Sequence, residues 1–128
     1  MDPLRELTPR RVSHFTTVDH DRHLALIAVR EQDGKETQVG VARYLATPER
    51  TRCEFSIVVA DEWQRKGLGT RLMLALIAAA RAAGVSVMHG EVLAGNHRML
   101  RFAAGLGFAP KTDRSDPRIL RVELPLQP

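Results

Sequence analysis

The chain has 128 residues, enough for one continuous core, and its 44% hydrophobic and 27% charged residues exclude a disordered protein. The net charge of +4 comes from scattered basic residues, and aromatic residues make up only 5%, so we expect no nucleic-acid partner. The single cysteine, Cys53, excludes a disulfide framework, and no leader-like or membrane-spanning apolar run is present. We therefore expect a single cytoplasmic domain over residues 1–128, with no membrane partner.

The sequence of the first half of the chain predicts an irregular polar segment at the N-terminus, followed by strands. Residues 1–22 are polar and irregular, and Thr8 followed by Pro9 favours a helix start. An apolar run at 24–29, a turn signal at Asp33-Gly34 and a second apolar run at 39–44 predict an antiparallel hairpin. Residues 54–60 are rich in β-branched side chains and predict a central strand.

The second half alternates helices and strands. Apolar residues at helical spacing predict a helix over 68–83, and Gly84 ends it. A strand at 85–93, a helix at 96–104 and a hairpin of 108–112 with 118–124 follow. This order predicts an α+β fold: a mixed, mostly antiparallel β-sheet with a central parallel strand–helix–strand crossover of right-handed sense.

The loop between the central strand and the long helix carries the clearest chemical signal. Gly67 and Gly69 allow a tight turn whose N–H groups face an anion, and the helix start adds unsatisfied donors and a positive dipole end. Arg65 and Lys66 add formal charge at the same place. The spacing matches neither a P-loop nor a dinucleotide fingerprint, so the loop predicts another phosphate or pyrophosphate site. The alternative is an ordinary strand-to-helix turn with basic surface residues.

Two motifs resemble those of one enzyme family. The pattern Gln64-x-x-Gly67-x-Gly69 is similar to the Gln/Arg-x-x-Gly-x-Gly/Ala motif of the GNAT acetyltransferases, and it stands between the same two elements. Asn96 followed by Gly107-Phe108 is similar to that family's next helix. The resemblance runs from about residue 7 to residue 124. It is closest to the GNAT domains of bacterial protein lysine acetyltransferases.

The resemblance implies a fold, a co-substrate and binding residues. The fold is the GNAT-type sheet, and the co-substrate is acetyl-CoA, with Gln64 beginning the binding motif. The pyrophosphate would bind the backbone amides of Arg65, Lys66, Gly67, Leu68, Gly69 and Thr70. The pantetheine arm would pair with the backbone of Ile57 and Val59, and Asn96 would reach the arm, cap its helix, or do both.

A carboxylate is needed to take the proton of the attacking amine, and Glu54 is the first candidate. The resemblance places the catalytic glutamate at this position, and a charge that opens an apolar strand calls for an explanation on physical grounds. Glu91 is the rival and His89 a weaker candidate, while His20 and His23 lack further ligands for a metal site.

Two departures from the family pattern bear on these expectations. Ala103 stands where many members carry a tyrosine that protonates the leaving thiolate, so the general acid is not identified. The first strand of the fold is expected to be lacking, which would leave 24–29 as a sheet edge. We expect a homodimer to cover that edge, or else residues 1–22.

The expected reaction is transfer of an acetyl group to a primary amine, with a protein lysine side chain as the favoured acceptor. A small-molecule amine is the second interpretation. The third is a non-catalytic module that binds acyl-CoA, which would fit the shortened N-terminus and the missing tyrosine. The residues that select the acceptor are expected within 1–22 and 109–118.

Overall fold

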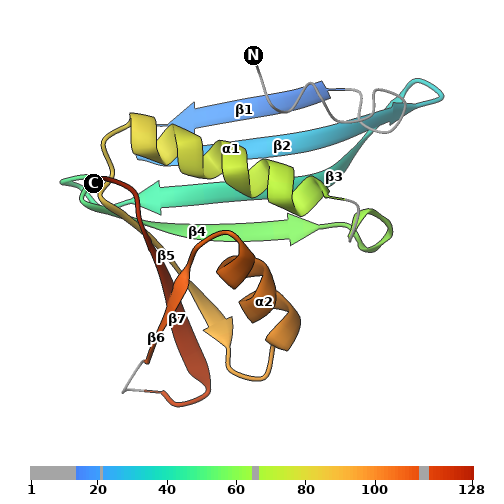
Figure 1. Ribbon diagram of the computed structural model, residues 1–128. Coiled ribbons are helices and arrows are strands. Elements are labelled where there is room, and N and C mark those ends of the chain that lie inside the picture. Colours follow the sequence, from blue (N-terminus) through green and yellow to red (C-terminus); the bar gives the residue numbers. More distant parts are fainter. Residues whose placement is uncertain (1–13, 21, 65–66, 113–115) are drawn as a thin grey trace.

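The computed structural model describes residues 14–20, 22–64, 67–112 and 116–128, which form one sheet with two α-helices (Figure 1). The elements are β1 (His14–His20), β2 (His23–Gln32), β3 (Lys35–Ala46), β4 (Arg52–Val59), η2 (Asp61–Trp63), α1 (Leu68–Ala82), β5 (Val87–Leu93), α2 (His97–Gly105), β6 (Ala109–Thr112) and β7 (Ile119–Pro125). The described residues form a seven-stranded sheet in the order β1-β2-β3-β4-β5-β7-β6. All neighbouring strands are antiparallel except β4 and β5, which are parallel and joined through α1. The α+β class and the central crossover predicted from the sequence are confirmed.

The expectation that the first strand is lacking is wrong. Strand β1 pairs with β2 along its whole length, from His14 opposite Val29 to His20 opposite His23. The alternative expectation, a cover supplied by residues 1–22, is therefore the one that the structure shows, and the edge-strand argument for a homodimer no longer holds. The strand was missed because residues 14–20 are mostly polar, with Phe15 and Val18 as the only apolar side chains, so they show neither a continuous apolar run nor a regular alternation. The expected helix start at Thr8 lies outside the described residues.

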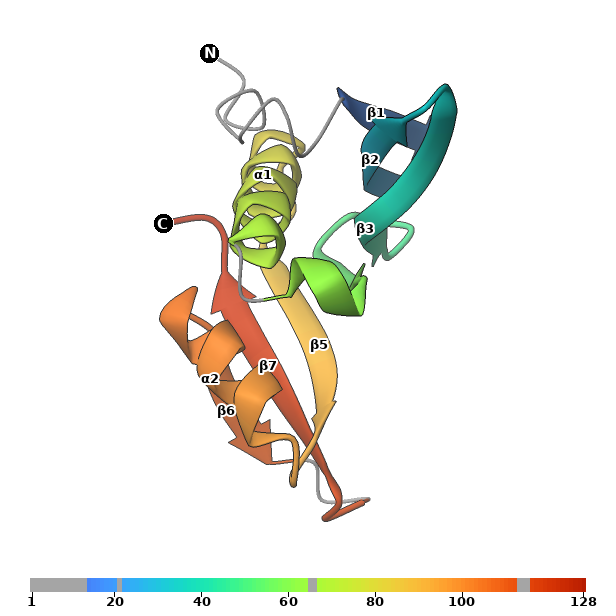
Figure 2. The same ribbon diagram turned by 90° about the vertical axis from the view of Figure 1, so that its right-hand side faces the viewer.

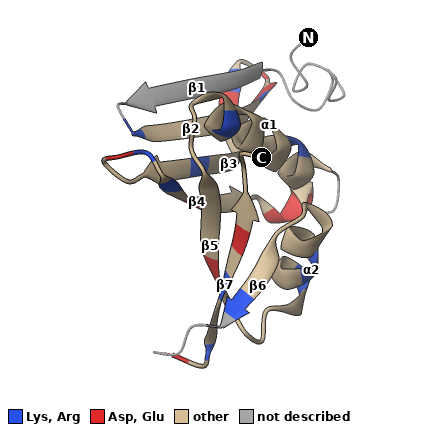
Figure 3. Ribbon diagram, turned by 60° about the vertical axis from the view of Figure 1, so that its left-hand side comes forward, with Lys and Arg blue, Asp and Glu red and all other residues tan. Residues whose placement is uncertain are grey.

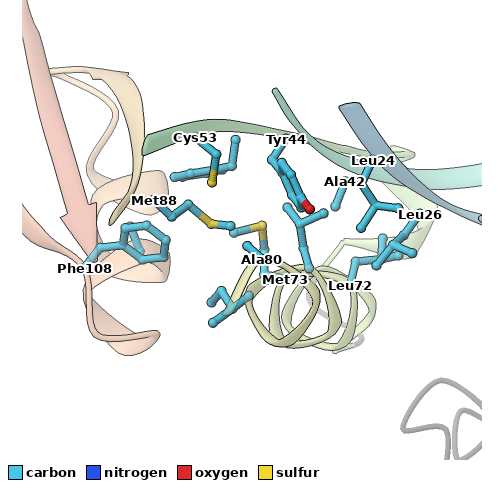
Figure 4. Close-up of a cluster of buried hydrophobic side chains, with 14 of the residues drawn as sticks. Leu24, Leu26, Ala42, Tyr44, Cys53, Leu72, Met73, Ala80, Met88 and Phe108 are labelled. Atoms are coloured by element: carbon cyan, nitrogen blue, oxygen red, sulfur yellow. The ribbon is translucent and has the colours of Figure 1, made fainter. Parts of the chain in front are cut away.

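Both helices lie on one side of the sheet and close the core (Figure 2). Helix α1 buries the apolar stripe that the sequence predicted, and it ends one residue before the expected Ala83. Its buried residues are Leu68, Leu72, Met73, Leu76, Ile77 and Ala80. Figure 4 shows this stripe facing sheet residues that include Tyr44, Cys53 and Met88. Within the described ranges, no helix is long and apolar enough to cross a membrane.

Strands β4 and β5 pair only near their beginnings and then diverge (Figure 1). Their register pairs are Arg52 with Val87, Cys53 with Met88, and Glu54 with His89. At the divergence the Phe55 ring lies against Gly90, where an added Cβ would come within 2.5 Å of Phe55 Cε1. A side chain larger than glycine at position 90 would therefore displace Phe55, whose ring also packs on Phe108 at a centroid distance of 5.0 Å. The packing thus fixes the place where the sheet opens.

Candidate active site

The opening between β4 and the two helices contains the main cavity of the described residues, about 490 Å³ in volume. Seven of the ten cofactor-binding residues expected from the sequence line it: Ile57, Val59, Gln64, Gly67, Gly69, Thr70 and Asn96. Arg65 and Lys66 lie outside the described residues. Leu68 does not line the cavity, because its side chain is 2% exposed and belongs to the core, so it can contribute only its backbone. A volume of this size lies in the range of small-molecule sites.

One wall of the main cavity is the beginning of α1. Gly67 precedes the helix with a φ of +85°, a left-handed conformation that L-residues other than glycine adopt at a cost. The amides of Leu68, Gly69 and Thr70 in the first turn have no carbonyl partner within the helix. No acidic residue stands in this turn. The wall therefore offers N–H donors and a positive dipole end to an anion.

Gln64 connects the end of β4 to α2 beside this wall. Its Nε2 donates to the Val59 carbonyl at 3.1 Å, and its Oε1 accepts from a guanidinium nitrogen of Arg98 at 3.3 Å. The Gln64 side chain therefore occupies one of the two acceptor positions of the Val59 carbonyl. Arg98 also lines the cavity and brings a positive charge that sequence reasoning missed. The sequence feature that could have indicated Arg98 is its position two residues after Asn96.

Helix α2 supplies the opposite wall. Asn96 caps it, since Asn96 Oδ1 accepts from the Met99 amide at 3.1 Å, and the same residue lines the cavity. Met99 and Phe102, three residues apart on the helix, complete the wall and were also missed. A Cβ on Gly69 would meet Phe102 at 3.6 Å and Ile57 at 3.7 Å, so these side chains form an apolar channel around Gly69.

Glu54 and His89 lie at the other end of the opening, at the last register pair before β4 and β5 diverge. Glu54 Oε2 is 3.8 Å from His89 Nε2, and the Glu54 side chain is 58% exposed. Because its neighbours Cys53 and Phe55 face the core, Glu54 points to the face of the sheet that carries no helix. Glu91, the rival base, lies two residues further along β5, opposite Arg121, where β4 no longer pairs.

His89 is held in its neutral form by its surroundings. Burial lowers its pKa, with the charges of Arg121 and Arg52 adding to this effect and those of Glu54 and Glu123 opposing it. Arg52 itself binds Glu123 at 2.7 Å across β5. Figure 3 shows acidic residues, in red, on both β5 and β7. His89 Nδ1 is buried without a hydrogen-bond partner. Glu54 therefore stands beside a neutral histidine at the junction of β4 and β5, with its own side chain exposed to solvent.

The His89 environment predicts a stability loss in acid. An unfolded histidine titrates near pH 6.5 and the folded one below it, so the unfolded chain binds the extra proton first as the pH falls. The contribution of neutral His89 to the free energy of unfolding is fully present above pH 6.5. It is lost as the pH falls through the pKa of His89 in the folded protein. His89→Gln removes this titrating group, so its free energy of unfolding should fall less than that of the wild type between about pH 7 and about pH 5. Urea unfolding at pH 8, 7, 6 and about 5 measures the difference. Parallel profiles for the two proteins would contradict the assignment, and His97→Gln, at an exposed histidine, is the matched control.

Two other chemistries find no support in the described residues. Burial raises the pKa of the Cys53 thiol to about 12, so it stays protonated at neutral pH and is no nucleophile. No group of three or more His, Cys, Asp or Glu residues among those described could hold a metal ion.

The fold and the cavity have the geometry of an acyl-CoA-dependent transferase: a helix start with unpaired amides, diverging parallel strands and a carboxylate at their junction. The chain matches the model of the Acetyltransferase (GNAT) family over residues 2–108, and it belongs to this family.

Several acetyltransferases are similar to this chain in sequence or in structure. The chain is similar to acetyltransferase PA5475 of Pseudomonas aeruginosa, with 32% identity over 113 residues, 88% of this chain and 61% of that protein. It is similar to the L-methionine sulfoximine/L-methionine sulfone acetyltransferase of the same species, with 41% identity over 59 residues, 46% of this chain and 34% of that one. The ribosomal-protein-S18-alanine N-acetyltransferase of Escherichia coli has a similar structure, with a TM-score of 0.66, 26% identity, and coverage of 84% of this chain and 72% of that one. The chain thus spans less than two thirds of the length of both P. aeruginosa relatives.

Proposed function

We propose that this chain is a single acetyltransferase domain that moves the acetyl group of acetyl-CoA to a primary amine. One observation carries the proposal: an anion-binding helix start and the Glu54 carboxylate lie at the two ends of one strand edge that the neighbouring strand leaves open. A linear molecule with an anionic end and a reactive end fits this arrangement.

The co-substrate is proposed to lie along β4. The Ala60 amide donates to the Val39 carbonyl, so the alternation of an antiparallel ladder turns the backbone groups of Ile57 and Val59 away from β3 and toward the opening. The pantetheine amides can pair there with Ile57 and with Val59. The pyrophosphate then lies on the amides at the start of α1, near Arg98.

The proposed reaction is a direct transfer in which the amine attacks the thioester carbonyl and the thiolate leaves. A lysine amine is neutral in about one molecule per thousand at pH 7.5, a cost of about 4 kcal/mol, so a base that removes its proton is needed. Glu54 is the proposed base. The protonated Cys53 thiol favours this route over an acyl-cysteine intermediate. Ala103 is buried and carries no acid group, so we propose that water protonates the thiolate.

We propose a protein lysine side chain as the acceptor, because the face beside Glu54 is not covered by either α-helix and can admit a bulky partner. The E. coli neighbour acts on a protein amine and one P. aeruginosa relative on amino-acid analogues, so a small amine is the second candidate.

The test is an acetyl-CoA turnover assay with panels of lysine peptides and small amines, beside calorimetry of acetyl-CoA binding. Turnover is expected with at least one panel. Binding without turnover of any amine would contradict the enzymatic proposal and favour a non-catalytic acyl-CoA-binding module.

A further inference from the structure

A second cavity lies on the sheet beside Glu54. Its volume is about 240 Å³, and strands β2, β3 and β4 line it with His23, Arg43, Tyr44, Leu45, Glu54, Phe55 and Ser56. Since Glu54 is proposed to take the amine proton, whatever binds in this second cavity is in a position to be the acetyl acceptor.

The second cavity holds two opposite charges that do not pair with each other. Arg43 is opposite Ser56 and Leu45 is opposite Glu54 in the β3–β4 register, so Arg43 and Glu54 are diagonal neighbours on one face. Such residues lie about 7–8 Å apart at the backbone. Within the described part of the chain, Arg43 makes no hydrogen bond or ion pair, and the only basic side chain near the Glu54 carboxylate is the neutral His89, at 3.8 Å.

The other lining residues fit a short molecule that connects these two charges. Leu45, opposite Glu54 and two residues along β3 from Arg43, is 57% exposed and offers an apolar surface for a carbon chain. Ser56 lies opposite Arg43, and His23 lies opposite Leu45 on the next strand, so both add polar groups. An exposed arginine without a partner is a strong site for a carboxylate, because its planar guanidinium binds both oxygens at once.

We infer that the acceptor carries a carboxylate close in space to its reacting amine, and that Arg43 binds this carboxylate while Glu54 faces the amine. The inference rests on the proposed acetyl transfer. Two sources provide this chemistry: a free amino acid, and a lysine beside an acidic residue in a protein. Arg43 is a specificity-determining residue in this arrangement, and it takes no part in the bond changes.

The experiment compares matched acceptors that differ only in the carboxylate. One arm uses free amino acids against their amides, and the other uses Lys-Asp peptides against Lys-Asn peptides. Wild-type kcat/KM should be roughly 10- to 100-fold higher for the carboxylated member of at least one arm, the size expected for a charge-assisted hydrogen bond. The arm that shows the preference identifies the source.

Arg43→Gln should abolish this preference by raising KM for the carboxylated acceptors much more than KM for the carboxyl-free ones. Lys35→Gln removes the same charge at the tip of the β2–β3 hairpin and should keep the preference. Equal kcat/KM for both members in both arms, or an equal loss in Lys35→Gln, overturns the inference and leaves acetyl transfer standing. Absence of turnover with every amine, carboxyl-free ones included, overturns both.

Discussion

Glu54→Gln should lower kcat by roughly 10²–10⁴-fold, the usual contribution of a general base. Glutamine keeps the size and the exposed position of the side chain but accepts no proton, and acetyl-CoA affinity should change little because Glu54 is not among the residues lining the main cavity. The loss should shrink as the pH approaches the pKa of the amine, since the fraction of neutral amine then rises without help. Steady-state kinetics between pH 7 and about 10 measure both effects.

Glu91→Gln is the matched control for this prediction. It makes the same change on β5, two residues beyond the Glu54–His89 pair, on a side chain that is also exposed. We expect kcat close to that of the wild type. Full activity in Glu54→Gln together with a large loss in Glu91→Gln would move the base to β5.

The sequence predicted those parts of the molecule that depend on local patterns. The apolar stripe of α1 repeats at helical spacing, and the glycine at position 84 ends that helix, so its limits were predicted to within one residue. The loop before α1 was predicted to bind a phosphate because Gly67 and Gly69 stand two apart at a helix start, and the positive φ of Gly67 agrees with the tight turn expected there. Asn96 was predicted as a helix cap from its position alone, and the hydrogen bond to Met99 confirms it.

The rest depends on contacts between residues far apart in the chain. Arg98 and Phe102 lie on a helix with ordinary composition, and they become part of the main cavity only because α2 packs beside the opened edge of β4. The pairing of Glu54 with His89 is set by the β4–β5 register, which no single segment encodes. Strand β1 was missed for the same reason, because its mostly polar residues carry no strand pattern of their own and its pairing with β2 defines it.

Gly67→Val should weaken acetyl-CoA binding by at least roughly 100-fold, which corresponds to the loss of two charge-assisted hydrogen bonds. Gly67 lines the main cavity, and the start of α1 depends on its φ of +85°. A valine there disfavours this conformation and turns the first-turn amides away from the pyrophosphate. Its side chain also enters the space that the ligand would occupy. Calorimetry with CoA and acetyl-CoA measures the loss.

The matched control is Gly84→Val at the other end of the same helix. Gly84 has the same φ of +85°, and no atom lies within 4 Å of an added Cβ at either glycine, so the two substitutions impose the same backbone strain. Each should lower the free energy of unfolding by about 1–2 kcal/mol, the cost of a left-handed L-residue. Only Gly67→Val should lose the ligand, because only that end of α1 lines the main cavity. Equal affinity losses in both variants would show that general destabilisation is the cause, and unchanged affinity in Gly67→Val would move the pyrophosphate away from this loop.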